Sequence, residues 1–143
     1  MVFVRDEGSV YNAPIDEVWR FLASGLSHSE AHHHRNAQHK SLPGFYSEDT
    51  WEEDFEGKPE TFTVRWTALR PLGVAYDVLQ GPFVGSKFFV YYRARGDKTR
   101  VTIVGDFVSP TIPAARVEAS VLAFFAREFE EDSAAIASMP PAE

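Results

Sequence analysis

All five histidines of the chain lie within one polar segment, SHSEAHHHRNAQHK, residues 27–40. If this segment is helical, His28 and His32 are one turn apart, the spacing at which two imidazoles can hold a metal ion. No glutamate completes a known zinc motif there, so the alternative of a solvated polar helix is favoured and no metal or other cofactor is expected. One histidine of the segment, if it faces an apolar pocket, would instead suit general acid–base chemistry such as enolisation or hydrolysis, although the sequence does not single out a catalytic residue.

A second set of polar residues lies within segments rich in aromatic residues. Any member that points inward is costly to bury unless it is paired, and is therefore a candidate for orienting a ligand. Simple alternation is the competing explanation, and under it about half of the set faces water. Arg65 and Tyr92 are the preferred inward pair, because arginine and tyrosine together can hold a carboxylate or a phenolic oxygen. The set is Glu53, Arg65, Tyr76, Asp77, Tyr92, Arg93 and Asp106.

Apolar residues recur at helical spacing near the C-terminus, at Val121, Phe124, Phe125 and Phe129. This stripe could be a ligand wall or ordinary core, and core is the more common use, although one residue can serve both. An acidic cluster, Glu128 and residues 130–132, overlaps the stripe. On a long helix such a cluster predicts a solvated face rather than a metal site.

Six segments with the sequence pattern of strands, together with three predicted helices, must position these residues. Short turns containing glycine or proline join most of the strands, so the sheet is predicted to be antiparallel. Asn12 and Pro14 open a first helix, which Ser24-Gly25 stops. The predicted strands are 2–11 with a bulge at Gly8, 51–55, 61–67, 74–79, 87–94 and 99–108, and the predicted helices are 12–23, 28–36 and 114–138. Residues 1–139 are expected to form a single domain, followed by a disordered tail, 140–143.

Composition excludes several classes of protein. The chain has no cysteine, which rules out disulfides, thiolate catalysis and cysteine-based metal sites. Its net charge of −7 has the wrong sign for a nucleic-acid binder or an anionic membrane surface. No stretch approaches the roughly 18 apolar residues of a membrane span, and the charged N-terminus does not resemble a secretory signal, so a cytoplasmic location is expected. Aromatic residues make up 14% of the chain, an excess that can line a pocket.

Three stretches of sequence resemble the START-like superfamily (SRPBCC proteins), which includes pollen allergens, polyketide aromatase/cyclases and lipid-transfer domains. VYNAPIDEVWRFL resembles its entry from strand to helix, and GPFVGSKFF with RGDKTRVTI resembles its last three strands. The likeness spans Val2 to Ala137. It implies an α+β helix-grip fold, in which a curved antiparallel sheet of six to seven strands wraps around a long C-terminal helix. Two short helices would follow the first strand, and a cavity would lie between sheet and helix, with the second helix as its gate.

The leading hypothesis is that the chain binds a small hydrophobic or aromatic molecule, lipid-like ligands included, in that cavity, as a monomer or homodimer. One alternative is an enzyme of the aromatase/cyclase or hydrolase kind that uses a cavity histidine or arginine. Another is a protein that binds a partner through the gate helix, as hormone-receptor members of the superfamily do. The residues expected to contact ligand are His32, Trp51, Glu53, Arg65, Trp66, Tyr76, Phe88, Tyr92, Val121 and Phe125.

Overall fold

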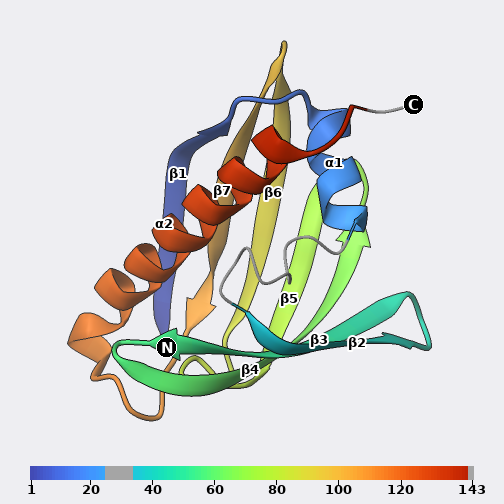
Figure 1. Ribbon diagram of the computed structural model, residues 1–143. Helices are drawn as coiled ribbons and strands as arrows, with labels where there is room; N and C mark the ends of the chain where they lie inside the picture. Colours follow the sequence, from blue (N-terminus) through green and yellow to red (C-terminus); the bar gives the residue numbers. More distant parts are fainter. Residues whose placement is uncertain (25–33, 142–143) are drawn as a thin grey trace.

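The computed structural model describes residues 1–24 and 34–141, and within them the chain forms seven strands and two helices (Figure 1). In chain order these are β1 (Val2–Tyr11), α1 (Ile15–Ala23), β2 (Arg35–Leu42), β3 (Tyr46–Phe55), β4 (Lys58–Leu69), β5 (Gly73–Gln80), β6 (Lys87–Arg95), β7 (Lys98–Phe107) and α2 (Ala114–Ser138). Neither described helix is long and apolar enough to cross a membrane.

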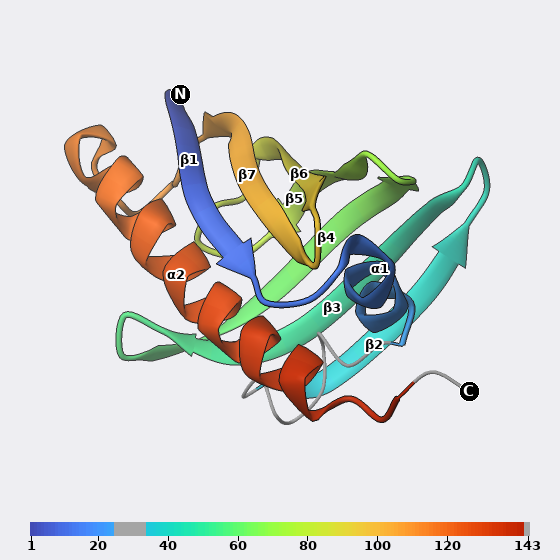
Figure 2. The same ribbon diagram turned by 90° about the horizontal axis from the view of Figure 1, so that it is seen from above.

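The strands form one antiparallel sheet in the order β1-β7-β6-β5-β4-β3-β2. Apart from β1, which pairs with the last strand, every strand lies beside its sequence neighbour, as short hairpin connections require. The sheet curves around α2, which crosses its concave side next to β1 (Figure 2). The predicted α+β helix-grip architecture is confirmed.

The first strand and helix follow the local signals in the sequence. The pairing of β1 with β7 shifts between Asp6 and Ser9, and Gly8 takes a φ of 100°, so the predicted bulge at Gly8 is present. α1 begins after Pro14 rather than at Asn12. It ends at Ser24, whose Oγ donates a 2.5 Å hydrogen bond to the carbonyl of Phe21.

The predicted helix over 28–36 is wrong in the part that the structure describes. Arg35 and Asn36 begin β2, which is exposed along almost its whole length and pairs with β3 from Arg35–Glu52 to Leu42–Tyr46. The polar sequence of β2 shows no alternation, so the open edge of β3 decides its conformation. Residues 25–33, which hold His28, His32 and the rest of the predicted gate helix, lie outside the described residues.

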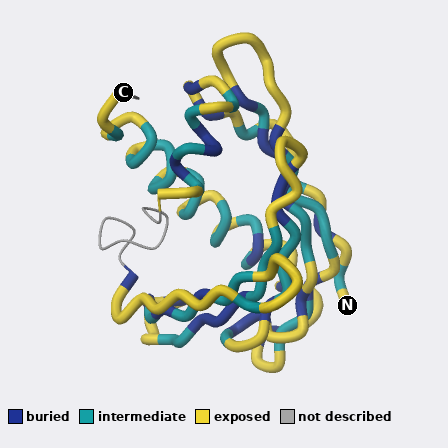
Figure 3. Tube along the Cα trace, turned by 90° about the vertical axis from the view of Figure 1, so that its right-hand side faces the viewer, coloured by how far each residue is buried: buried dark blue, intermediate teal, exposed yellow. Residues whose placement is uncertain are grey.

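The C-terminal helix fills the concave side of the sheet. α2 has the predicted bounds, and its Val117 and Val121 are almost completely buried. Along the Cα trace, most of the turns and almost all of β2 are exposed, while buried residues lie mainly along the other strands (Figure 3). Beyond α2, the carbonyl of Pro140 accepts a 2.7 Å hydrogen bond from Arg20, so the helix end is tied to α1.

Candidate functional site

An inner cavity of about 150 Å³ lies between α2 and the concave face of the sheet. Its apolar wall combines side chains from β3 to β7 with one face of α2. The aromatic excess seen in the sequence gathers here, because seven phenylalanines line the cavity: Phe62, Phe83, Phe88, Phe107, Phe124, Phe125 and Phe129.

The rings hold one another in defined orientations. Phe62 of β4 stacks on Phe124 of α2 with ring centroids 5.6 Å apart. Phe88 of β6 meets Phe125 edge to face at 5.2 Å. Contacts of this kind stabilise the wall beyond the apolar area that they bury. The cavity therefore has a preorganised aromatic surface.

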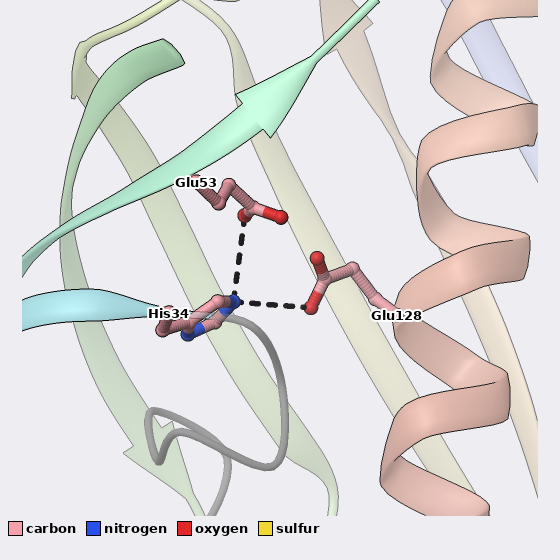
Figure 4. A group of neighbouring side chains, drawn as sticks. All are labelled: His34, Glu53 and Glu128. Atoms are coloured by element: carbon pink, nitrogen blue, oxygen red, sulfur yellow. Dashed lines mark ion pairs between the residues drawn. The ribbon is translucent and has the colours of Figure 1, made fainter. Parts of the chain in front are cut away.

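A polar cluster interrupts this wall where β2, β3 and α2 meet (Figure 4). His34, directly before β2, points its Nε2 toward Glu53 of β3 and Glu128 of α2. The Nε2 atom lies 3.4 Å from Glu53 Oε1 and 3.7 Å from Glu128 Oε2. His34 and Glu128 also line the cavity, whereas Glu53 is completely buried behind them.

Glu53 is held by donors on both of its oxygens. Trp51 Nε1 donates a 2.8 Å hydrogen bond to Oε1, and the Arg127 guanidinium forms an ion pair with Oε2. The imidazole of His34 stacks on the Trp51 indole, with centroids 4.9 Å apart. Buried carboxylates need this degree of pairing, since an unpaired buried charge is strongly destabilising.

These contacts shift the pKa values of His34 and Glu53 in opposite directions. Burial of His34 on its own would lower its pKa, but the adjacent Glu128 and Glu53 outweigh burial and raise the pKa of His34 to about 9. Burial would raise the pKa of Glu53, but His34, Trp51 and Arg127 together hold it below the ordinary value. At neutral pH the pair is therefore an imidazolium next to a carboxylate.

Glu128 behaves differently from Glu53. Burial raises the pKa of Glu128 to about 7, reinforced by the charges of Glu53 and Glu131 and opposed by His34. Its Oε1 is buried and has no hydrogen-bond partner among the described residues. A carboxyl that titrates near neutrality at a cavity wall can bind a donor, or give and accept a proton.

Three tyrosines and an aspartate add further polar groups to the cavity lining. Tyr11 stacks on Phe129 at 4.6 Å, and its hydroxyl donates a 3.3 Å hydrogen bond to Asp132 Oδ2. Burial raises the pKa of Tyr11, Tyr76 and Tyr92 above the ordinary value, so their hydroxyls stay protonated at physiological pH.

The cluster His34, Glu53 and Glu128 also has the composition of a metal site. One ligand atom from each side chain lies within 4.8 Å of the others. However, both Glu53 oxygens already accept hydrogen bonds, and the raised pKa of His34 disfavours the neutral imidazole that a metal requires. The contacts therefore suit an ion-pair network better than a metal ion.

An outer pocket of about 500 Å³ adjoins the inner cavity and shares Leu22 and Tyr76 with it. Asp49 is buried there and accepts a 2.5 Å hydrogen bond from Trp66 Nε1. Its other carboxylate oxygen accepts a 2.7 Å hydrogen bond from His39 when Nδ1 of that ring carries the hydrogen. Tyr76 and Leu22 therefore lie between the two spaces.

Comparison with known proteins bears on the fold. No protein-family model and no curated protein matches the sequence. Among solved structures, the Zhui aromatase/cyclase from Streptomyces sp. R1128 is 20% identical, with a TM-score of 0.70 over 94% of this chain and 92% of that one. Ara h 8.0201 is 12% identical, with a TM-score of 0.72 over 96% and 99% of the two chains. Truncated norcoclaurine synthase from Thalictrum flavum is 10% identical, with a TM-score of 0.72 over 97% and 95%.

These three proteins share one architecture with this chain over nearly its whole length. The chain has the helix-grip fold that these proteins share. At such low identities the likeness shows the helix-grip fold and leaves the chemistry to the residues of the cavity.

The residues predicted to contact ligand lie at several different places in the structure. Five of them line the inner cavity: Trp51, Tyr76, Phe88, Tyr92 and Phe125. Glu53 lies buried behind the cavity wall, and Trp66 lines the outer pocket. Val121 is part of the core and does not reach either space. His32, together with the metal candidate His28, lies outside the described residues.

The predicted inward pair of Arg65 and Tyr92 is not formed. Val64 and Trp66, on either side of Arg65 in β4, line the inner cavity and the outer pocket respectively, so Arg65 points to the opposite face of the sheet. There it lies across from Glu48 and Asp77 on the neighbouring strands. The alternation explanation therefore holds for Arg65.

Sequence reasoning missed three residues of the polar wall: His34, Glu128 and Asp132. Glu128 and Asp132 were interpreted as part of a solvated acidic face, but both line the inner cavity. A signal was present, because Phe124, Glu128 and Asp132 follow one another at intervals of four residues on α2 and so share a helix face. His34 carried no such signal, since its position depends on β2.

Proposed function

We propose that the chain binds a small aromatic or otherwise apolar molecule in the inner cavity, with the polar end of the ligand against Glu128 and Asp132. The observation that carries this proposal is a cavity lined by seven phenylalanines with one polar wall. A few polar groups converging on an apolar pocket is the usual composition of a ligand site. A dry apolar cavity of about this volume holds a benzene-sized molecule.

Saturation-transfer-difference NMR with indole and 2-naphthol tests this proposal. Both probes should bind the wild-type protein, and Ile103→Phe, which fills the cavity, should abolish the signal. Val10→Phe, at an exposed position of β1, is the matched control and should retain binding. Circular dichroism establishes that each variant is folded. If neither probe binds the wild type, or if folded Ile103→Phe binds as the wild type does, the inner cavity is not a ligand site.

A second candidate function is proton transfer to and from a bound carbonyl compound. The observation that favours it is Glu128, whose pKa is about 7 and whose Oε1 has no hydrogen-bond partner among the described residues. In this reaction Oε1 removes a proton from the carbon next to the carbonyl group. The electrons move to the carbonyl oxygen, to which a protonated hydroxyl such as that of Tyr76 or Tyr92 can donate a hydrogen bond.

Deuterium exchange of phenylacetone in D₂O measures this reaction. The wild-type protein should accelerate exchange at the methylene carbon, and Glu128→Gln should reduce the rate to background because the amide cannot act as the base. Glu118→Gln, on the exposed face of the same helix, should leave the rate unchanged. If the wild type does not accelerate exchange, the proposed proton transfer is contradicted, and the proposed ligand binding is unaffected.

A further inference from the structure

We infer that the inner cavity selects aromatic ligands that carry a protonated amine over ligands of the same shape that carry a carboxylate. This inference rests on the proposed binding function and names the chemical class of its ligand. Its basis is the charge of the polar wall. Among the described residues that line the inner cavity there is no lysine or arginine, whereas two carboxylates, Glu128 and Asp132, are present.

The one cationic side chain in that lining is already engaged. His34 Nε2 lies between Glu53 Oε1 at 3.4 Å and Glu128 Oε2 at 3.7 Å. Arg127 is committed to Glu53, lies 3.8 Å from Glu131, and is outside the lining. Among the described residues around the wall, two cations, His34 and Arg127, are therefore set against four carboxylates, so the wall carries excess negative charge whenever the carboxyl groups are ionised. The four are Glu53, Glu128, Glu131 and Asp132.

The two carboxylates that line the cavity, Glu128 and Asp132, are placed to accept hydrogen bonds from a ligand group with several N–H donors. Glu128 and Asp132 are four residues apart on α2 and so lie one above the other on the face that lines the cavity. Glu128 Oε1 is buried and has no hydrogen-bond partner among the described residues. A primary ammonium group brings three N–H donors and a positive charge. It would supply the donor that Oε1 lacks and offset the charge of the wall.

A ligand that carries a carboxylate should bind this wall less well than an amine does. It brings only acceptors and a third negative charge to the two carboxylates of the wall, in surroundings where charges are poorly screened. The hydroxyls of Tyr76 and Tyr92 can donate hydrogen bonds to it, but they carry no compensating charge. The phenylalanine wall accepts the ring of either ligand equally, so the head group decides the preference.

Three ligands of similar shape isolate the head group: 2-phenylethylamine, propylbenzene and 3-phenylpropionate. Dissociation constants are measured by NMR titration at pH 7.5 and low ionic strength, with wild type, Glu128→Gln and the exposed control Glu118→Gln. We expect the wild type to bind the amine at least tenfold more tightly than the carboxylate. Glu128→Gln should reduce this ratio to below threefold while the affinity for propylbenzene changes little, and Glu118→Gln should match the wild type.

Each other outcome has a definite meaning. If propylbenzene binds but the amine binds no better than the carboxylate, the charge selection is overturned and the binding function stands. If the preference persists in folded Glu128→Gln, the selection does not arise at this wall and the inference is also overturned. If none of the three ligands binds the wild type, the proposed binding function fails first. Glu128→Asp, which keeps the charge and should keep the preference, serves as a second variant should Glu128→Gln fold poorly.

Discussion

The indole Nε1 of Trp51 donates a 2.8 Å hydrogen bond to the Oε1 of Glu53, two residues further along β3. Residues two apart in a strand point to the same face, so this bond joins a side chain of the cavity wall to the buried carboxylate behind it. His34 stacks on Trp51 and approaches the same oxygen. The wall and the ion-pair network are therefore one structural unit.

Replacement of Glu53 by glutamine should destabilise the protein by about 3–5 kcal/mol, the typical cost of removing one partner from a buried ion pair. The amide keeps the shape of the side chain but cannot neutralise His34 and Arg127, both of which contact Glu53. Chemical denaturation monitored by circular dichroism measures the free energy of unfolding.

Asp54→Asn is the matched control for that substitution. Asp54 is the next residue in β3, and it pairs at 3.1 Å with Arg35 while both side chains remain largely exposed. Exposed pairs contribute at most about 1 kcal/mol, so the control should lose little stability. A loss for Glu53→Gln no larger than that of Asp54→Asn would contradict the assigned role of Glu53.

Stability should fall as pH rises from about 5 to 9. The folded-state pKa of Glu128 is raised from 4.5 to about 7 and that of His34 from 6.5 to about 9, so the folded state holds more protons than the unfolded state in both windows. The His34 shift alone corresponds to about 3 kcal/mol lost between pH 6.5 and 9. Below about pH 4.5 the lowered pKa of Glu53 reverses the trend, because its stabilising charge is lost as pH falls.

Denaturant titrations at half-unit pH intervals measure this profile. The free energy of unfolding should be greatest near pH 5. His34→Gln should remove the part of the decline that is due to His34, whereas Glu128, no longer opposed by the imidazolium, keeps a raised pKa and its own decline. Stability that rises between pH 6.5 and 9 in the wild type would show that His34 is not held as an imidazolium.

Removal of the Asp49 side chain should cost about 2–3 kcal/mol. Asp49→Ala leaves Nε1 of the half-buried Trp66 without its acceptor in the outer pocket, and a donor that loses its partner away from bulk water carries a desolvation penalty. His39→Gln is the control, since the His39 side chain is 53% exposed and should contribute less than about 1 kcal/mol. Differential scanning calorimetry of both variants distinguishes the two contributions.

Substitutions at Val121 and at Phe125 should have different effects, because the first should lower stability and the second should weaken ligand binding. Val121 is fully buried away from the cavity, so Val121→Ala should lower stability by about 2 kcal/mol and leave the affinity for indole unchanged. Phe125 lines the cavity, so Phe125→Leu should weaken indole binding severalfold through loss of its ring contact. Equal effects of both substitutions on affinity would argue against the inner cavity as the binding site.

Apart from β2, local patterns predicted the described strands and helices in their observed order, and many of their bounds. β1 and α2 have the predicted residues, and the bulge at Gly8 is present, because each depends on neighbouring residues: a strand alternation, a helical stripe and a glycine with positive φ. β2 could not be predicted in this way. Its eight residues, most of them polar, show no period, and its hydrogen bonds come from the edge of β3.

The sequence by itself therefore determined the curved sheet with its long helix, and the aromatic content available to a cavity. Only the tertiary structure decided which strand faces line that cavity, because bulges and register shifts change the phase of alternation between one strand and the next. It also brought His34 to Glu53 and Glu128, residues far apart in the chain. The charges of the polar wall follow from that approach, since burial and neighbouring groups shift the pKa of a side chain only once the chain has folded around it.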